Sequence, residues 1–216
     1  MKKIKENLQD NYQLVLEKTR EVFAGKNPGE MALKGAVSYL SYSPLSLRRF
    51  VVPYLGRFFE VHWPTGEVYP WGEGKEAPFP ISLVILHYLS DAVGTPPEGK
   101  WLSFIDLWGG RSFDAAFRER ALKPLSQTFH ENTGFFIKAV KRLGGTSSPQ
   151  YKNGYLIFAF PKIPLLCFLH PGDEEVPTKS NILFDAVANN YLVTEDLAIV
   201  GETLSEFIIQ FQEARS

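Results

Sequence analysis

His87 and Asp91 are the first residues whose types and spacing could do chemistry, because they stand four apart in an apolar stretch. Residues four apart share one face of a helix, so the carboxylate can orient the imidazole and favour its charged form. Such a pair can act as a general base or as an oriented metal ligand. The structural alternative, which we favour, is the polar edge of a buried helix near its C-terminal end.

A second candidate is the acidic segment 170–175, which reads His-Pro-Gly-Asp-Glu-Glu. It follows an apolar run, and its Pro-Gly pair forces a turn, so a loop at a strand end is predicted to carry it. Asp173, Glu174 and Glu175 beside His170 could bind a hard cation or a basic group. A solvated turn is the structural alternative.

Asp185 is the third candidate, because this acid closes the apolar segment 181–185. Burying a carboxylate without partners is costly, so hydrogen-bond donors must satisfy it. Asp185 is therefore either a cap for the chain that follows or a group held at a functional site. We favour the cap.

The segment 100–111 is the fourth candidate, because it contains two tryptophans and a Gly-Gly pair. Aromatic walls with accessible backbone can form a flat ligand slot, although a loop that covers the core has the same features. The sequence assigns no catalytic residue and no metal ligand. The candidate binding residues are His87, Asp91, Trp101, Trp108, Asp173, Glu174 and Asp185.

Several motifs of common enzyme classes are absent from the sequence. It has no phosphate-binding loop ending in Gly-Lys-Ser or Gly-Lys-Thr, no dinucleotide fingerprint, no His-Glu-x-x-His and no Gly-x-Ser-x-Gly. The histidines at 62, 87, 130 and 170 are widely scattered. Whether the chain is an enzyme stays open.

The candidates need elements to position them, and hydrophobic periodicity predicts both helices and strands. Pro124 lies inside one predicted helix and should kink or divide it. Residues 155–160 and 165–169 are short, wholly apolar runs typical of buried strands. We predict helices at about 4–24, 80–92, 113–130, 135–143 and 195–212, and further strands at 32–40, 50–52, 58–63 and 68–69.

These elements predict an α+β fold in which antiparallel sheets are packed by about four to six helices. The chain has 216 residues, of which 44% are hydrophobic, enough to bury a core without disulfides or a structural metal. We expect one domain over residues 1–216. The loop at 72–78 is the best candidate boundary if there are two.

Composition limits the partners. The 23 basic and 24 acidic residues give a net charge of −1, so we expect no nucleic acid. The single cysteine, Cys167, lies in an apolar run, so we expect a buried, unreactive thiol and no iron–sulfur cluster of the chain's own. The N-terminus lacks the apolar core of a signal peptide, and residues 81–93 are too short to span a bilayer. We therefore expect a soluble, cytoplasmic protein.

A series of short strings stands in a characteristic order at residues 87–89, 99–110, 124–125, 143–145, 161–164, 173–175, 181–185 and 194–197. In this order and spacing the chain resembles domain-of-unknown-function family 3786 of anaerobic bacteria and archaea, over about residues 30–212. Lys162 stands where the family pattern would have arginine, which puts a fork-like anion contact there in doubt.

The resemblance implies a setting but no reaction, because the family is uncharacterised and supplies no catalytic residues. Its members occur beside iron–sulfur and corrinoid proteins, which implies anaerobic metabolism and such a protein as partner. We therefore expect an accessory ligand- or protein-binding module of anaerobic redox or corrinoid metabolism. The alternative is a metal-assisted hydrolase or lyase that uses the acids at 173–185 with His87 or His170. The ligand and the oligomeric state stay open.

Overall fold

The computed structural model of the chain describes residues 2–41, 48–173 and 175–213, with side chains described from residue 11 to residue 211 within these ranges. The predicted α+β class is confirmed, because helices accompany two antiparallel sheets. The chain divides into two compact units, Met1–Val52 with Phe58–Gly94, and Pro53–Arg57 with Thr95–Ser216. The division after Gly94 differs from the predicted boundary at 72–78. A single domain over 1–216 stays a prediction.

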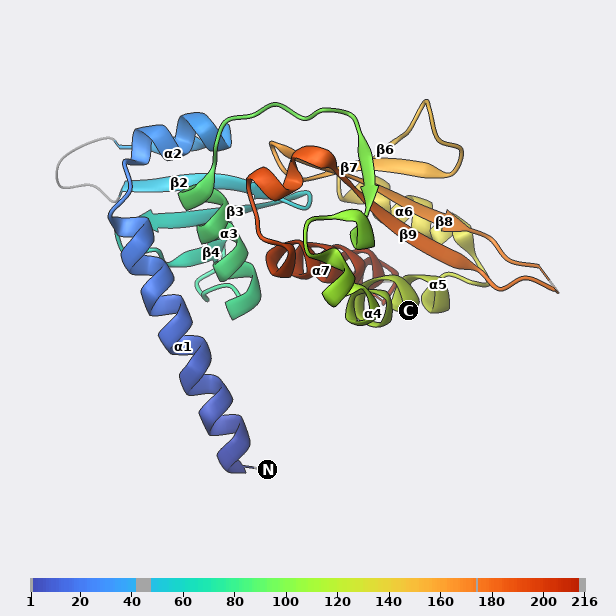
Figure 1. Cartoon of the computed structure of the whole chain (residues 1–216), viewed down its shortest axis with the longest axis horizontal. Helices are drawn as coiled ribbons and strands as arrows, with labels where there is room; N and C mark the ends of the chain where they lie inside the picture. Colours follow the sequence, from blue (N-terminus) through green and yellow to red (C-terminus); the bar gives the residue numbers. More distant parts are fainter. Residues whose placement is uncertain (1, 42–47, 174, 214–216) are drawn as a thin grey trace. The chain divides into compact units, whose positions relative to one another are not determined.

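The first unit contains a four-stranded sheet in the order β1-β2-β3-β4 (Figure 1). Alternate residues of its strands, such as Phe50, Val52 and Val61, are buried, as expected for a sheet with one covered face. The predicted helix at 80–92 is confirmed and is buried on nearly every side. The elements are α1 (Lys2–Ala24), α2 (Pro28–Gly35), β1 (Ser38–Leu40), β2 (Arg48–Tyr54), β3 (Arg57–Trp63), β4 (Val68–Pro70) and α3 (Phe79–Asp91).

Residues 28–35 form helix α2, so the predicted strand at 32–40 is wrong except for its end in β1. The Asn27 side chain accepts a hydrogen bond from the Glu30 N–H and caps the helix, and Pro28 occupies its first turn. The Asn27-Pro28 pair follows α1 and is typical of the end of a helix. The same residues also begin the next one.

Helix α1 is confirmed, but its apolar stripe is only partly buried. Tyr12 stacks on Phe79 at 4.6 Å between ring centroids, and Thr19 and Phe23 are buried, whereas Val15 and Val22 are about half exposed. Helix α3, against which α1 packs, has 13 residues where α1 has 23. At 1.5 Å per residue, α3 is too short to cover the whole stripe, and the first half of α1 extends past it (Figure 1).

Charged side chains on the outer face of the first sheet form a connected network. Glu60 accepts hydrogen bonds from Arg49 Nη1 at 2.8 Å and lies 2.9 Å from His62 Nε2. The other ring nitrogen of His62 lies 3.4 Å from Glu67. Burial raises the pKa of Glu60, but the hydrogen bonds from His62 and Arg49 outweigh that effect and hold the pKa below its ordinary value.

Replacing Glu60 by glutamine should therefore remove the part of the folding stability that depends on the ionised Glu60 carboxylate. A lowered folded-state pKa means that Glu60 stabilises the fold above its unfolded pKa, and that this contribution is lost as pH falls through the folded pKa. Urea unfolding of both proteins should show Glu60→Gln less stable at about pH 7, with the difference shrinking at about pH 3. An equal difference at both pH values would contradict this assignment.

The second unit contains a five-stranded antiparallel sheet in the order β5-β9-β8-β7-β6. The middle strand, β8, is buried from Ile163 to Leu169, as its continuous apolar run predicts. The strands are β5 (Trp101–Ser103), β6 (Thr146–Ser147), β7 (Gly154–Phe160), β8 (Ile163–His170) and β9 (Lys179–Asp185). The helical elements are η1 (Phe104–Asp106), η2 (Gly110–Ser112), α4 (Asp114–Phe117), η3 (Arg118–Leu122), α5 (Lys123–Thr128), α6 (Thr133–Arg142), η4 (Ala186–Asn190) and α7 (Thr194–Glu213).

Helix α7 packs against the segment α4–η3–α5 at a glycine. A Cβ atom on Gly201 would lie 2.4 Å from Cε2 of Phe117, so only glycine allows this approach. Phe117 in turn stacks on Phe104, with ring centroids 4.0 Å apart, and contacts Phe184 of β9 at 6.0 Å. This aromatic group joins α7, α4, η1 and the sheet into one core.

Cys167 lies in the middle of β8 and is fully buried, as predicted. Burial raises the pKa of its thiol to about 12. Because the thiolate is the reactive form, Cys167 is a packing residue of the sheet.

The tip of the β2–β3 hairpin, Pro53–Arg57, belongs to the second unit. The Leu55 N–H donates to the Ala159 carbonyl at 3.0 Å. The Arg57 guanidinium lies over the Phe207 ring, 3.7 Å from its centroid, and donates to Gln210. Gly56 has a φ of +74°, and a Cβ there would lie 2.2 Å from the Leu143 carbonyl oxygen. The hairpin tip is therefore a packed part of the second unit.

Candidate functional site

A break in the predicted helix at 113–130 shapes the candidate site. Pro124 has no N–H and its ring displaces the preceding turn, so a regular helix cannot pass through it. The chain forms a wider π-type turn over Arg118–Leu122, in which the Lys123 N–H donates to the carbonyl of Arg118, five residues earlier. The predicted division at Pro124 is confirmed. Such π segments are frequent at functional sites.

A cavity of about 240 Å³ lies beside this π segment, between it and the ends of β8 and β9. Phe104, Phe117 and Leu122 give it an apolar floor. Polar side chains make up the remainder of its lining, namely Ser103, Asp114, Arg118, His170, Lys179, Ser180 and Asn181. An apolar floor with a few converging polar groups is the usual form of a small-molecule site.

The charges around this small cavity are predominantly positive. Arg118 Nε donates to Asp114 at 2.6 Å, so these two charges largely offset each other. His170 and Lys179 face each other in the β8–β9 register, and both are exposed. Neither makes an ion pair with another residue that the structure describes. Lys179 is therefore a cation at the cavity mouth that a ligand could neutralise.

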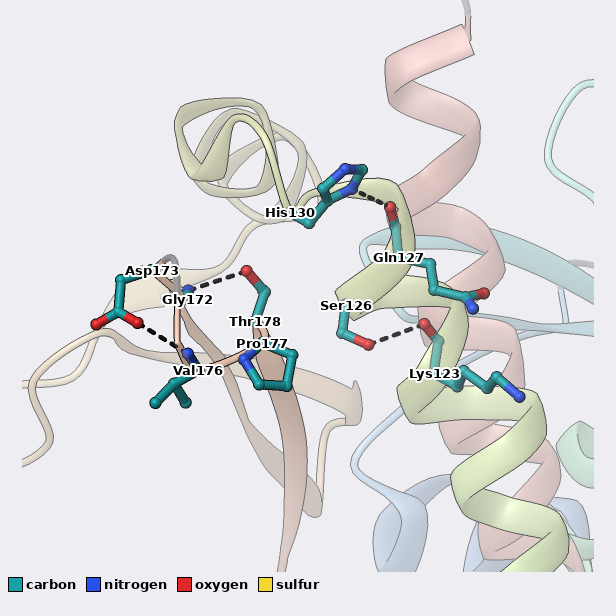
Figure 2. A pocket seen from close by; sticks show the side chains of 9 residues that line it. All are labelled: Lys123, Ser126, Gln127, His130, Gly172, Asp173, Val176, Pro177 and Thr178. Atoms are coloured by element: carbon teal, nitrogen blue, oxygen red, sulfur yellow. Dashed lines mark hydrogen bonds between the residues drawn. The ribbon is translucent and has the colours of Figure 1, made fainter.

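A larger cavity of about 930 Å³ is lined by residues from the segment 123–130, which follows the π segment, and from the segment 172–178, which precedes β9 (Figure 2). Its two walls are α5 with the residues just after it, and the loop that joins β8 to β9. Figure 2 shows the side chains of Lys123, Ser126, Gln127 and His130 along the helix wall. Gly172, Asp173, Val176, Pro177 and Thr178 form the opposite wall. The Ser180 hydroxyl donates to the Leu122 carbonyl at 2.6 Å, which ties β9 to η3. Leu122 lines the small cavity, and the next residue, Lys123, lines the larger one.

Asp173 shapes the loop wall of the larger cavity. Its Oδ1 accepts hydrogen bonds from the Glu175 N–H at 3.0 Å and the Val176 N–H at 2.8 Å. These two backbone donors lower the pKa of Asp173. The carboxylate thus closes a turn, the structural alternative raised from the sequence. Glu174 lies outside the described residues, and Glu175 is exposed.

Asp185 is fully buried and is satisfied by backbone donors. Its two oxygens accept hydrogen bonds from the N–H groups of Glu98 at 3.0 Å, Gly99 at 2.7 Å and Val187 at 3.0 Å. Asp185 caps η4 and fixes the loop before β5 at the same time. The structure therefore assigns Asp185 the role of a cap.

The two tryptophans of segment 100–111 differ in environment. Trp101 is half-buried in β5, where it pairs with Asp185 in register, and the Trp108 side chain is 83% exposed. The Trp108 backbone is fixed by the Asn189 side chain, which accepts from its N–H at 3.0 Å, and by the Thr194 hydroxyl, which donates to its carbonyl. Neither tryptophan lines the small or the larger cavity.

His87 and Asp91 lie in the first unit, on α3. His87 is half-buried, with Nε2 3.5 Å from the Thr19 hydroxyl, which itself donates to the Val15 carbonyl. Asp91 is exposed in the last turn of the helix. The other candidate residues belong to the second unit, and their role as binding residues stays a prediction.

The described ranges contain neither a cluster of metal-binding side chains nor a membrane-spanning helix. Within them, no three or more His, Cys, Asp or Glu side chains gather in a way that could hold a metal ion. No helix in the same part of the chain is long and apolar enough to cross a membrane.

The site residues missed by sequence analysis are Arg118, Lys179 and Phe117, which stacks on Phe104 of the segment 100–111. Three signals in the sequence pointed to this region, namely Pro124 inside a helical period, His170 beside the acidic segment, and the segment 100–111 that contains Phe104. Lys179 and Arg118 belong to no recognisable sequence motif. Only the pairing of β8 with β9 and the packing of α4 bring them to one cavity.

The fold and the cavities together define an α+β protein with a small, partly basic cavity beside a broken helix. The chain belongs to the family described as Domain of unknown function (DUF3786), whose model matches residues 27–207. Helix α1 thus precedes the matched region. No curated protein and no solved structure matches the chain.

Proposed function

We propose that this chain is an accessory binding module whose small cavity takes a compact ligand with an apolar ring and an anionic group. The observation that carries the proposal is the combination of a stacked Phe104–Phe117 floor with Lys179 at the mouth, a cation that forms no ion pair with any residue that the structure describes. The floor would remove the apolar surface of the ligand's ring from water, and the cation would add a charge-assisted hydrogen bond. A cavity of about 240 Å³ is below the range usual for drug-sized ligands, so it has room for one ring system with its anionic group, and any further ring of an occupant would lie outside it.

The small cavity supports binding better than catalysis. The acids suggested for a metal-assisted hydrolase, Asp173 and Asp185, direct their carboxylates to backbone N–H groups. A general base or metal ligand needs a lone pair directed at the substrate or the ion. Asp114, which does line the cavity, is held by Arg118. We therefore place the binding module ahead of the hydrolase.

The setting of this module follows from the family resemblance alone. We propose that it acts in the cytoplasm of an anaerobe, beside an iron–sulfur or corrinoid protein. The larger cavity, whose walls are α5 and the β8–β9 loop, offers room for a segment of such a partner. Copurification of an iron–sulfur or corrinoid protein with the chain from its own host is the expected result, and copurification of unrelated proteins only would contradict this setting.

Lys179→Gln is expected to weaken the binding of 8-anilinonaphthalene-1-sulfonate, an aromatic anion, by about fivefold. That factor corresponds to ~1 kcal/mol, the value expected for one charge-assisted hydrogen bond at an exposed site. The neutral dye N-phenyl-1-naphthylamine lacks the sulfonate, so its affinity should not change. Fluorescence titration of both dyes measures the two affinities.

The matched control is Lys152→Gln, which removes an exposed lysine that lines neither cavity. This variant should bind both dyes as the parent chain does. Equal losses for the charged and the neutral dye in Lys179→Gln would mean that the cavity had changed shape. No loss for either dye would rule out Lys179 as the anion contact.

A further inference from the structure

The outer face of the β1–β4 sheet carries two exposed aromatic side chains that sequence analysis did not single out. Phe58 is 56% exposed and Trp71 is 54% exposed. The Trp71 N–H donates to the Phe58 carbonyl at 2.9 Å, and the pairing of Phe59 with Pro70 places Phe58 and Trp71 opposite each other. Residues directly opposite in an antiparallel pair project to the same side of the sheet. The two rings therefore form a platform on one face.

Hydrogen-bonding groups border this aromatic platform. The Arg49 guanidinium lies over one face of the Trp71 ring, 5.9 Å from its centre, and is 36% exposed, so the other face of the indole is the one open to a ligand. Glu60, which is only 18% exposed, holds Arg49 in place from below, and His62 holds Glu60. Arg49 is thus a donor of fixed position at the edge of the platform formed by Phe58 and Trp71, and Glu60 and His62 are positioning residues.

The charge of this face decides which class of ligand fits it. Arg49 and His62 are each paired with carboxylates, Glu60 and Glu67. The two carboxylates match or exceed the positive charge, so this face offers no net attraction to a polyanion. A single-stranded nucleic acid would need unpaired lysines or arginines along its phosphates. The face therefore favours a neutral ligand.

A hexose meets these requirements. One side of its ring presents C–H groups, which are attracted to the electron-rich face of an aromatic ring. Its rim carries hydroxyl groups, which can accept from a guanidinium and donate to a carboxylate. Stacking on Trp71 would bring the hydroxyls of the ring to the position of Arg49.

We propose that the outer face of this sheet binds an uncharged oligosaccharide, with sugar rings stacked on Trp71 and Phe58 and hydroxyl groups bound by Arg49. This site lies in the first unit and is independent of the small cavity in the second. Trp71 and Phe58 are the contact residues, and their exposure means that neither is needed for the core.

The test is titration of the full chain with cellohexaose, maltohexaose and laminarihexaose. Calorimetry and tryptophan fluorescence both measure the binding. At least one of the three should bind saturably at millimolar concentrations or below and change the fluorescence. Trp71→Ala should weaken that binding about tenfold, or ~1.4 kcal/mol, and Arg49→Gln should weaken it less. Trp108→Ala removes a more exposed indole in the second unit and should leave the affinity unchanged.

Three outcomes would overturn the proposal. The first is no binding of any of the three oligosaccharides. The second is binding of polyuridylate through Trp71 with a steep salt dependence, which would mark a nucleic-acid surface. The third is self-association of the chain that Trp71→Ala abolishes, which would make the face a contact between copies. Circular dichroism of each variant, with the parent spectrum expected, checks that a lost affinity reflects a lost contact.

Discussion

Replacing Asp185 by alanine is expected to lower the free energy of unfolding by about 3 kcal/mol, because three backbone donors would lose their acceptor and the Val187 donor among them is buried. The carboxylate is fully buried and accepts from the N–H groups of Glu98, Gly99 and Val187. Glu98 and Gly99 precede β5, and Val187 follows β9. Unsatisfied buried donors each cost about 1–3 kcal/mol. Urea unfolding followed by circular dichroism measures the change.

Asp91→Ala is the matched control for this substitution. Asp91 is exposed in the last turn of α3, where an acid gains nothing from the helix dipole. Its replacement should change the free energy of unfolding by less than about 0.5 kcal/mol. If Asp185→Ala were as mild as Asp91→Ala, the carboxylate would not be the cap that its three hydrogen bonds indicate. Asp185 would then be free to serve a ligand.

Gly201→Ala is expected to destabilise the chain by about 2 kcal/mol through overpacking. The new Cβ atom would lie 2.4 Å from the Phe117 ring, which is almost fully buried and stacked on Phe104, so the ring cannot move aside without cost. Alanine is the better helix former by about 1 kcal/mol, so a net loss would have to come from packing. Because Phe117 lies in the floor of the small cavity, the aromatic anion should also bind less well.

Gly35→Ala provides the comparison for Gly201→Ala. A Cβ there would meet Cε1 of Tyr88 at 3.4 Å, an ordinary contact, and the backbone φ is not positive. This variant should be neutral or slightly stabilising in the same unfolding experiment. Equal stability of the two glycine variants would contradict the close approach of α7 to Phe117.

Elements with strong periodicity could be predicted from the sequence. The all-round apolar run at 80–92 is a buried helix, and the wholly apolar run at 165–169 lies in the central strand of a sheet. Pro124 divides its helix for the chemical reason that it lacks an N–H. In each case a local property of the residues decides the structure.

Features that depend on tertiary contacts could not be predicted in this way. Residues 28–35 form a helix because Asn27 caps it, but the same Asn-Pro pair also reads as the end of a helix. The partly exposed stripe of α1 follows from the shorter length of α3, which the period of α1 does not contain.

In the candidate site, too, local features could be predicted from the sequence and features that depend on tertiary contacts could not. The need for partners at Asp185 could be read from an acid closing an apolar segment, and the cap we favoured is what the hydrogen bonds show. Lys179, Arg118 and the Phe104–Phe117 stack come from three parts of the chain that no spacing connects. The outer-face platform of Phe58 and Trp71 was likewise invisible, because their strands were predicted without a register.

The most direct test of the proposed function is a crystal structure of the chain with bound 8-anilinonaphthalene-1-sulfonate. The proposal predicts the naphthalene ring over Phe104 and Phe117, with the sulfonate within hydrogen-bonding distance of Lys179 Nζ. Dye bound only elsewhere, for example on Trp71 or Trp108, with the small cavity holding none, would contradict it.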